Sequence, residues 1–295
     1  MREILILDCP ELQCPPVLVV VFKELCGAFA RRGHQVKIAR SLNEIHDNCI
    51  VFMGDSIKVE NPVGLLAQYS TKAIYIGWYW HKQKDLDKLP YFIHTYENVL
   101  SNTLLADKVD MIGFMKEHKN SCPLLLRANE DPENIGKSLH ENIYDYCFMG
   151  GRMCDWLVPY QEFKGFYYGV HDIGMYMGYE DRKKIYLASA FALGFQTDDN
   201  INNGHVSQRI YEGMAHGCIV LSHSLHASLQ TEGIVEYVEP HREKIAERMR
   251  FLLKHPEYMK EKQQRGYDFV KRKGTNTYSI QLFIDTIKNV YGINV

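Results

Sequence analysis

An arginine and a glutamate three residues apart, Arg209 and Glu212, have the types and spacing that predict chemistry most directly in this chain. Residues three apart lie on the same face of a helix. A carboxylate there can accept hydrogen bonds from both hydroxyls of a ribose, and an arginine can pair with a diphosphate. The spacing predicts that this segment binds a nucleotide; the alternative is an i,i+3 ion pair on a solvated helix.

Small residues and a short apolar strand surround this pair. Residues 206–222 have the sequence VSQRIYEGMAHGCIVLS. Because Gly213, Ala215 and Gly217 are small, we expect the helix to lie close to its ligand and to the neighbouring strand. The strand ends at Ser222, which we include among the predicted binding residues. This setting favours binding over a plain ion pair.

A glycine turn follows another predicted strand, where Gly150-Gly151-Arg152 comes directly after an apolar run. Backbone N–H groups at such a turn can cradle an anion, and the arginine can neutralise it. An ordinary tight turn with a surface arginine is the alternative. We predict that Gly150, Gly151 and Arg152 bind the same diphosphate as Arg209.

Polar residues also follow strands in the first half of the chain. His94 follows the run Tyr91-Phe92-Ile93, Asp55 follows Phe52-Met53-Gly54, and Asp8 follows the first strand. A neutral imidazole can hold a hydroxyl group or take a proton. We predict His94 and Asp55, together with Arg209, as catalytic residues, although a lone His or Asp is more often structural.

Alternating strands and helices must position these residues. The predicted strands of the first half are residues 3–8, 34–39, 49–53 and 72–78, with a fifth that starts at residue 91, and a helix covers 17–32. The second half has predicted strands at 144–149, 165–170, 190–196, 218–222 and 234–238, and helices at 179–187, 206–216 and from 241 onward, with breaks at His255-Pro256 and Gly274. This alternation is typical of parallel sheets with crossover helices, whose ligands bind at strand ends.

A polar stretch, residues 127–136, separates the two series. It predicts a domain boundary. We therefore assign residues 1–138 to an N-terminal domain, 139–278 to a nucleotide-binding domain, and 279–295 to a helix that returns to the first domain.

The pattern R-x-x-E-x-x-A-x-G-C, at Arg209, Glu212, Ala215, Gly217 and Cys218, resembles the donor-binding block of GT-B glycosyltransferases. The resemblance implies an α/β fold of two Rossmann-like domains facing a central cleft, with the C-terminal helix crossing back. It also implies a nucleotide-diphosphate sugar as donor substrate, with no further cofactor and no bound metal. The first domain would bind the acceptor.

The resemblance also implies roles for the candidate residues. Glu212 would hold the ribose, Arg152 and Arg209 would stabilise the leaving diphosphate, and His94 would position the sugar or act as base. Retaining relatives carry a further glutamate eight residues before the ribose-binding one, where this chain has Gly204. The stereochemistry therefore stays open.

The predicted activity is that of a hexosyl- or pentosyltransferase acting on a saccharide or other hydroxyl acceptor. A sugar-nucleotide epimerase of the same fold and a non-catalytic nucleotide-sugar-binding protein are the alternatives. The formal charge of −2 disfavours a nucleic acid acceptor. A saccharide acceptor is favoured by aromatic residues on which a sugar ring can stack: Trp78, Tyr79, Trp80 and Tyr96.

Composition and the remaining motifs exclude several other classes. The longest apolar run, residues 17–22, is too short to span a bilayer, and the N-terminus has the pattern of a strand, so we expect a cytoplasmic protein. Eight cysteines without a C-x-x-C pair predict buried free thiols. Asp85-Leu86-Asp87 looks like a metal-binding D-x-D motif, but its polar surroundings predict a solvated surface.

Overall fold

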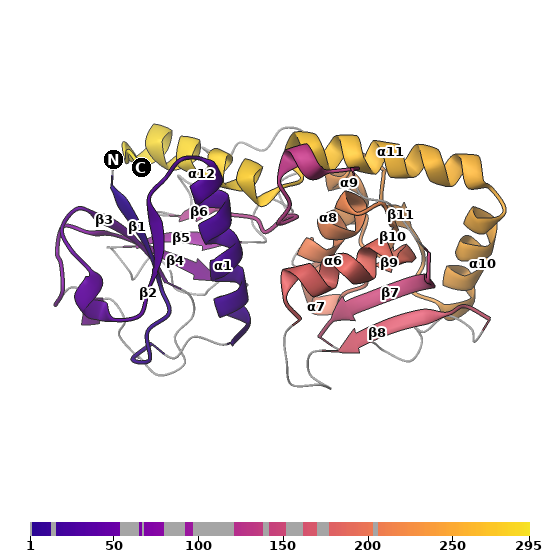
Figure 1. The fold of residues 1–295 in the computed structure, drawn as a ribbon, viewed down its shortest axis with the longest axis horizontal. Helices are drawn as coiled ribbons and strands as arrows, with labels where there is room; N and C mark the ends of the chain where they lie inside the picture. Colours follow the sequence, from indigo (N-terminus) through magenta and orange to yellow (C-terminus); the bar gives the residue numbers. More distant parts are fainter. Residues whose placement is uncertain are drawn as a thin grey trace. The chain divides into compact units, whose positions relative to one another are not determined.

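The computed structural model describes residues 2–12, 16–53, 65–66, 68–79, 92–96, 121–137, 142–151, 162–169, 177–202 and 206–295. They form two compact units. The first comprises Met1–Leu125 and Asn276–Val295, and the second comprises Leu126–Thr275. Each unit is built on its own sheet (Figure 1).

The first unit contains a six-stranded sheet in the order β2-β1-β3-β4-β5-β6. Its strands are β1 (Glu3–Leu7), β2 (Val36–Ala39), β3 (Cys49–Met53), β4 (Ile74–Tyr79), β5 (Phe92–Tyr96) and β6 (Ser121–Pro123). Every neighbouring pair is parallel, as the alternation of strands and helices predicts. After β1 the chain adds β2 on one side and β3 on the other, so the strand order reverses there.

Two helices cover one face of this sheet, α1 (Pro16–Arg31) and α12 (Asn276–Tyr291), which lie side by side (Figure 1). Phe52 of β3 packs between them: its ring centroid lies 5.3 Å from that of Phe29 and 5.6 Å from that of Phe283. Arg31 donates a 2.8 Å hydrogen bond to Thr277, which joins the two helices at one end. The C-terminal helix therefore belongs to the first unit, as predicted.

The second unit contains a five-stranded parallel sheet in the order β11-β10-β9-β7-β8. Its strands are β7 (Tyr144–Gly150), β8 (Gly165–Gly169), β9 (Ser189–Leu193), β10 (Ile219–Ser222) and β11 (Glu236–Tyr237). Its helices are α6 (Tyr179–Leu187), α7 (Asp198–Asn202), α8 (Gln208–Ala215), α9 (Leu225–Gln230), α10 (Arg242–Leu253) and α11 (Pro256–Lys273). The strand order reverses between β7 and β9.

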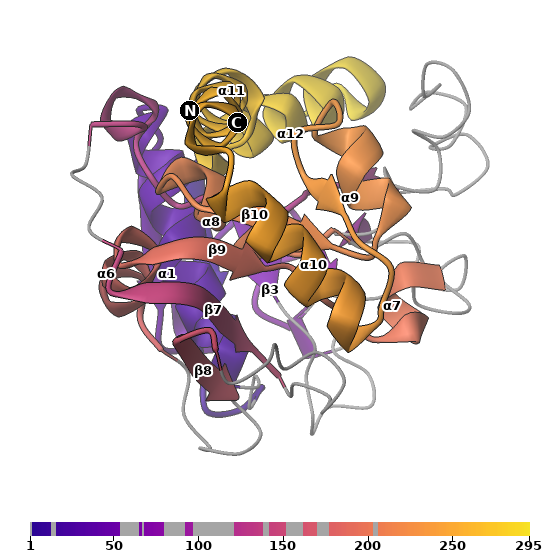
Figure 2. The same ribbon diagram turned by 90° about the vertical axis from the view of Figure 1, so that its right-hand side faces the viewer.

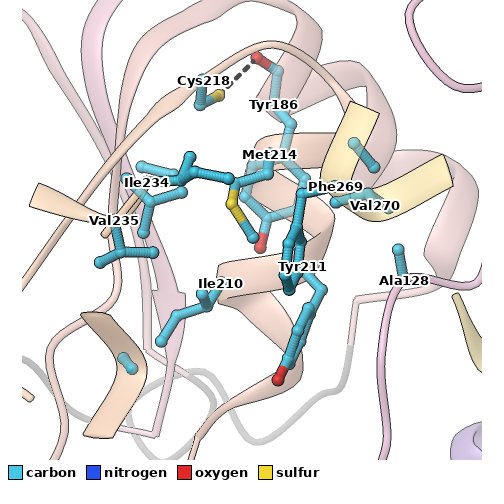
Figure 3. Packing of buried hydrophobic residues seen from close by; sticks show 14 of the residues in the cluster. Ala128, Tyr186, Ile210, Tyr211, Met214, Cys218, Ile234, Val235, Phe269 and Val270 are labelled. Atoms are coloured by element: carbon cyan, nitrogen blue, oxygen red, sulfur yellow. Dashed lines mark hydrogen bonds between the residues drawn. The ribbon is translucent and has the colours of Figure 1, made fainter. Parts of the chain in front are cut away.

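Hydrophobic clusters fill both faces of the second sheet. On one face α10, which crosses the sheet in Figure 2, buries Ile245, Met249 and Leu252. On the other face α8 and α11 pack together, and the rings of Tyr211 and Phe269 stack with centroids 6.5 Å apart (Figure 3). The sheet is therefore the middle layer of an α/β/α sandwich.

Most predicted elements occur within a few residues of their expected positions. The predicted helix at 179–187 and the predicted strand at 49–53 have the observed bounds. The helical tail breaks where expected, since Pro256 begins α11 and Gly274 follows its end. Helix α9 was not predicted, and β11 is shorter than expected because only Glu236 and Tyr237 pair with β10.

In the described residues, the cysteines and the helices agree with what the sequence predicts about free thiols and membrane-spanning segments. All five cysteines whose side chains are described are free, and all but Cys26 are buried. Burial raises the pKa of the Cys218 thiol well above its ordinary value. Its sulfur donates to the carbonyl oxygen of Tyr186 at 3.1 Å (Figure 3). Across the described part of the chain, no helix is both long and apolar enough to cross a membrane.

Candidate functional site

The guanidinium of Arg209 lies against the end of strand β7. Gly150 is the last residue of that strand, and a Cβ built on it would overlap Nη1 of Arg209 and lie 2.9 Å from its Cζ. Only a residue without a side chain leaves this room. The fold thus brings together two predicted site residues, Gly150 and Arg209, that are far apart in the sequence.

Three further contacts hold Arg209 in place. Its Nη1 donates to the carbonyl oxygen of Phe195 at 3.2 Å, and its Nε donates to Oγ of Ser207 at 3.0 Å. Its Cζ lies 5.1 Å from the centroid of the Phe148 ring, within the range of a cation–π contact. These contacts come from β7, from the segment after β9 and from the start of α8, so the charge is fixed where the three elements meet.

This meeting point is the place where the strand order of the sheet reverses. From β7 the chain adds β8 on one side and β9 on the other. In open parallel sheets, ligands bind outside the carboxyl ends of the strands at such a switch point. Arg209 is also the second residue of α8, where the helix dipole adds positive character. The site therefore favours an anion.

Small residues let α8 pack directly on the sheet. A Cβ on Gly213 would lie 2.9 Å from Cβ of Ala192 in β9 and 3.0 Å from Cγ2 of Val220 in β10. The helix ends at Ala215, and Gly217, just beyond its cap residue His216, has a φ of 81°, a conformation that favours glycine. The close approach predicted for the helix and its neighbouring strand is confirmed, and it fixes the height of Arg209 above the sheet.

Glu212, one turn after Arg209, pairs with Arg182 of α6. Nη2 of Arg182 lies 2.7 Å from Oε1 and Nε lies 3.0 Å from Oε2, a two-pronged ion pair. The side chain of Glu212 is 2% exposed and that of Arg182 is 14% exposed. The alternative of a solvated ion pair with Arg209 is therefore wrong, because this face of α8 is buried and the partner comes from another helix.

A polar cluster continues from this pair along α6. The carboxylate of Glu130 accepts hydrogen bonds from the Tyr179 hydroxyl at 3.0 Å and from Nζ of Lys183 at 2.5 Å. The Tyr179 hydroxyl also lies 3.1 Å from Nε2 of His216. Burial acts to raise the pKa of Glu130, but Lys183 and the Tyr179 hydroxyl outweigh it and hold this pKa below its usual value.

Three residues of this cluster were not predicted: Arg182, Lys183 and Glu130. Their partners lie 30 to 53 residues away along the chain, so no local spacing relates them. The only signal was the run Arg182-Lys183-Lys184 in a predicted helix, and such a run is typical of a solvated face.

Other predicted site residues are placed only in part. Ser222 is buried, and its hydroxyl donates to the carbonyl oxygen of Gly194 at 3.1 Å and accepts from the Ser224 N–H at 3.1 Å, so it braces the ends of β9 and β10. Gly151 follows β7 directly. The backbone of His94 lies in β5, in register with Gly77 and Ser121.

Several predicted residues lie outside the described part of the chain: Arg152, Asp55 and the Asp85-Leu86-Asp87 motif. Asp8 is described, and its carboxylate forms an ion pair with Arg40. The binding and catalytic roles of all these residues stay predictions.

Comparisons with known proteins place the chain among sugar-transferring proteins. The family model described as "Glycosyl transferase-like" matches residues 138–285. No curated protein matches the sequence at a significant level.

Solved structures match the fold over nearly the whole chain. One is the DNA modifying enzyme beta-glucosyltransferase, solved with and without its substrate uridine diphosphoglucose; identity is 12%, the match covers 99% of this chain and 100% of that chain, and the TM-score is 0.57. A second is an alpha-glucosyltransferase in complex with UDP and a 13-mer DNA containing an HMU base, with 12% identity, 98% and 100% coverage, and a TM-score of 0.63.

A third is the alpha,alpha-trehalose 6-phosphate synthase from Burkholderia multivorans, with 7% identity, 99% and 97% coverage, and a TM-score of 0.55. Together these likenesses confirm the predicted fold class, an α/β chain with two Rossmann-like units of the GT-B type.

Proposed function

Because this chain belongs to the glycosyl transferase-like family and is a glycosyltransferase, we propose that its second unit binds the donor through Arg209. The donor in this proposal is a nucleotide-diphosphate sugar. The observation that carries the proposal is the position of the Arg209 guanidinium against Gly150, at the switch point between β7 and β9. Family membership favours sugar transfer over an epimerase or a non-catalytic binding protein.

In the proposed mechanism, Arg209 stabilises the negative charge of the leaving diphosphate. The bond between the sugar's anomeric carbon and the diphosphate oxygen breaks, and a bond from that carbon to the acceptor oxygen forms. The acceptor proton passes to a base, and the electron pair of the broken bond remains on the diphosphate. A fixed positive charge at that oxygen lowers the barrier because it is already in place.

The remaining donor contacts are part of the same proposal. Arg152 and the backbone of Gly150 and Gly151 hold the diphosphate. Glu212 accepts hydrogen bonds from the ribose, since each carboxylate oxygen has a second acceptor position beyond the one used by Arg182. Ser222 supports the same strand end.

The first unit is proposed to bind the acceptor. His94, in β5, either holds the transferred sugar or takes the acceptor proton, and Asp55 is the second candidate base. Two arginines neutralise the diphosphate in this scheme, so the reaction proceeds without a divalent metal or a further cofactor.

A saccharide is the acceptor that we propose first. The formal charge of −2 provides no excess of basic residues. The sequence predicts an aromatic partner for a sugar ring at Trp78, Tyr79 and Trp80, whose side chains lie outside the described part of the chain. A hydroxylated DNA base is the second candidate. Of the two glucosyltransferases that match along their whole length, one is described as a DNA modifying enzyme and the other is in complex with a 13-mer DNA. Transfer from a labelled donor to oligosaccharides and to hydroxymethylated DNA compares the two directly.

A thermal-shift screen tests the donor site. Wild-type protein is heated with UDP, ADP and GDP and with their sugar conjugates. A donor at 100 times its Kd should add about 2.7 kcal/mol to the unfolding free energy. Arg209→Gln should lose this gain. Arg250→Gln should keep it, because Arg250 pairs with Glu162 on an exposed part of the same unit.

Two outcomes would reject the donor site. One is a wild-type protein that no nucleotide stabilises. The other is an Arg209→Gln protein that responds to nucleotides as strongly as the Arg250→Gln control.

A further inference from the structure

We propose that Arg182 is a positioning residue that orients the Glu212 carboxylate toward the donor ribose, an assignment that rests on the donor site proposed above. Arg182 would thereby set the discrimination between ribose and 2′-deoxyribose nucleotides. It has no contact of its own with the donor in this scheme and acts through Glu212.

The ion pair fixes the plane of the carboxylate. Arg182 meets both oxygens of Glu212, one through Nη2 at 2.7 Å and the other through Nε at 3.0 Å. A planar guanidinium bound in this way prevents the carboxylate from rotating about its last bond. The second acceptor position of each oxygen then has a fixed direction, which suits two neighbouring hydroxyls such as those of a ribose.

Arg182 is itself held in place by contacts with residues other than Glu212. Its third nitrogen, Nη1, donates to the carbonyl oxygen of Met177 at 2.9 Å, and its Cζ lies 5.7 Å from the centroid of the Tyr179 ring. The Tyr179 hydroxyl is bound to Glu130, which Lys183 also contacts. Arg182 is therefore held by the Met177 carbonyl and the Tyr179 ring, and Tyr179 is itself fixed by a hydrogen-bonded cluster. A lysine at residue 182 would not reproduce the two-pronged contact with Glu212.

The competing explanation is that the pair only ties α6 to α8. Replacing a buried ion pair by apolar residues is often neutral for stability, so the pair is weak evidence for a stabilising role. The two explanations differ in one measurable quantity. A purely structural pair does not affect the ratio of affinities for ribose and 2′-deoxyribose nucleotides, whereas a positioning residue does.

Isothermal titration with UDP, ADP and GDP, each paired with its 2′-deoxy analogue, measures this ratio. For the best-bound base, wild type should prefer the ribonucleotide by about 10-fold or more, as expected for a hydrogen bond to a charged group. Arg182→Lys should reduce the preference to about 3-fold or less, with a smaller change in affinity for the 2′-deoxy analogue. The matched control Arg250→Lys should keep the wild-type ratio.

Thermal melts establish that each variant is folded. If Arg182→Lys does not fold, Arg182→Gln, which retains an amide donor for Glu212, provides the same comparison. Glu212→Gln should also reduce the ratio, and the double variant Arg182→Lys with Glu212→Gln should reduce it no further, because both act on one interaction.

The outcomes distinguish failure of the positioning role of Arg182 from failure of the proposed donor site. If Glu212→Gln loses the ribose preference and Arg182→Lys keeps it, the positioning role is overturned and the donor site stands. If wild type binds none of the nucleotides, the donor site fails and the positioning role fails with it.

Discussion

Replacing Gly150 with alanine perturbs the candidate site at its closest contact. A Cβ at residue 150 would overlap Nη1 of Arg209 and lie 2.8 Å from Cζ of Phe148. Phe148 is buried in the core, and β7 is a central strand with neighbours on both sides. The tip of Arg209 is the more movable group, so we expect the guanidinium to be displaced while the backbone stays in place.

The cost in stability follows from the contacts that Arg209 loses. Its hydrogen bond to the Phe195 carbonyl contributes about 1 kcal/mol. Its contact with the Phe148 ring contributes about 0.5–1 kcal/mol. The unfolding free energy should therefore fall by about 1.5–2 kcal/mol, which leaves a typical domain folded at 25 °C.

The cost in donor binding should be larger. A hydrogen bond between charged groups contributes about 1.5–3 kcal/mol, so a displaced Arg209 should weaken donor binding about 10- to 150-fold. Isothermal titration with the nucleotide that most stabilises wild type gives Kd, and a thermal melt gives the stability of the same sample.

Gly266→Ala is the matched control. Gly266 lies in α11, and a Cβ there would make an ordinary contact, 3.5 Å from Cβ of Met214. This change should stabilise the helix by about 0.5–1 kcal/mol and leave Kd unchanged. A folded Gly150→Ala protein that binds the nucleotide within twofold of wild type would refute our reasoning about Arg209.

Three further predictions concern pH, metal and nucleic acid. The pKa of Glu130 is held below its ordinary 4.5, so its ionised form stabilises the fold above that pH, and the gain disappears as pH falls through the lowered pKa. When the pH is lowered below 4.5, the stability of Glu130→Gln in thermal melts should therefore fall less than that of wild type. An equal fall in the two proteins would contradict this prediction. Sugar transfer should persist in EDTA, and a complete loss that Mg²⁺ or Mn²⁺ reverses would disprove metal independence. Duplex DNA should bind weakly in filter assays; tight binding that falls about 10³-fold between 50 and 200 mM salt would instead favour a DNA acceptor.

Local patterns predicted the elements well, because strand and helix periodicities depend on neighbouring residues. Helix α6 and strand β3 have the predicted bounds for this reason. The contact between Gly150 and Arg209 was predicted less directly. That prediction relied on the expectation that strand ends share one edge of a parallel sheet. The partner of Glu212 could not be predicted. Arg182 reaches it from another helix, and the packing of two helices has no signature in local spacing.

The candidate site residues of the first unit show a different limit. Strand-end logic put His94 just after a strand that ends at Ile93, but its backbone lies in the middle of β5 (Phe92–Tyr96). The start of this strand is visible in its apolar residues, but its end depends on pairing with β4 and β6, which residue order alone does not determine. The positions of site residues on one helix and its adjacent strand can be predicted from the sequence. Positions that depend on segments distant in the chain cannot.

The way α12 completes the first unit has a consequence for folding during synthesis. Ile280, Phe283 and Ile287 of this helix are buried, and Phe283 packs on Phe52 of β3. Residues 126–275, which make up the whole second unit, are synthesised before α12. The second unit is continuous in sequence and can close its core as soon as it emerges from the ribosome. The first unit, although its strands emerge earlier, keeps Phe52 without its aromatic partner Phe283 until α12 has been synthesised. The usual order, in which the N-terminal domain folds first, is therefore reversed for the final packing of this chain.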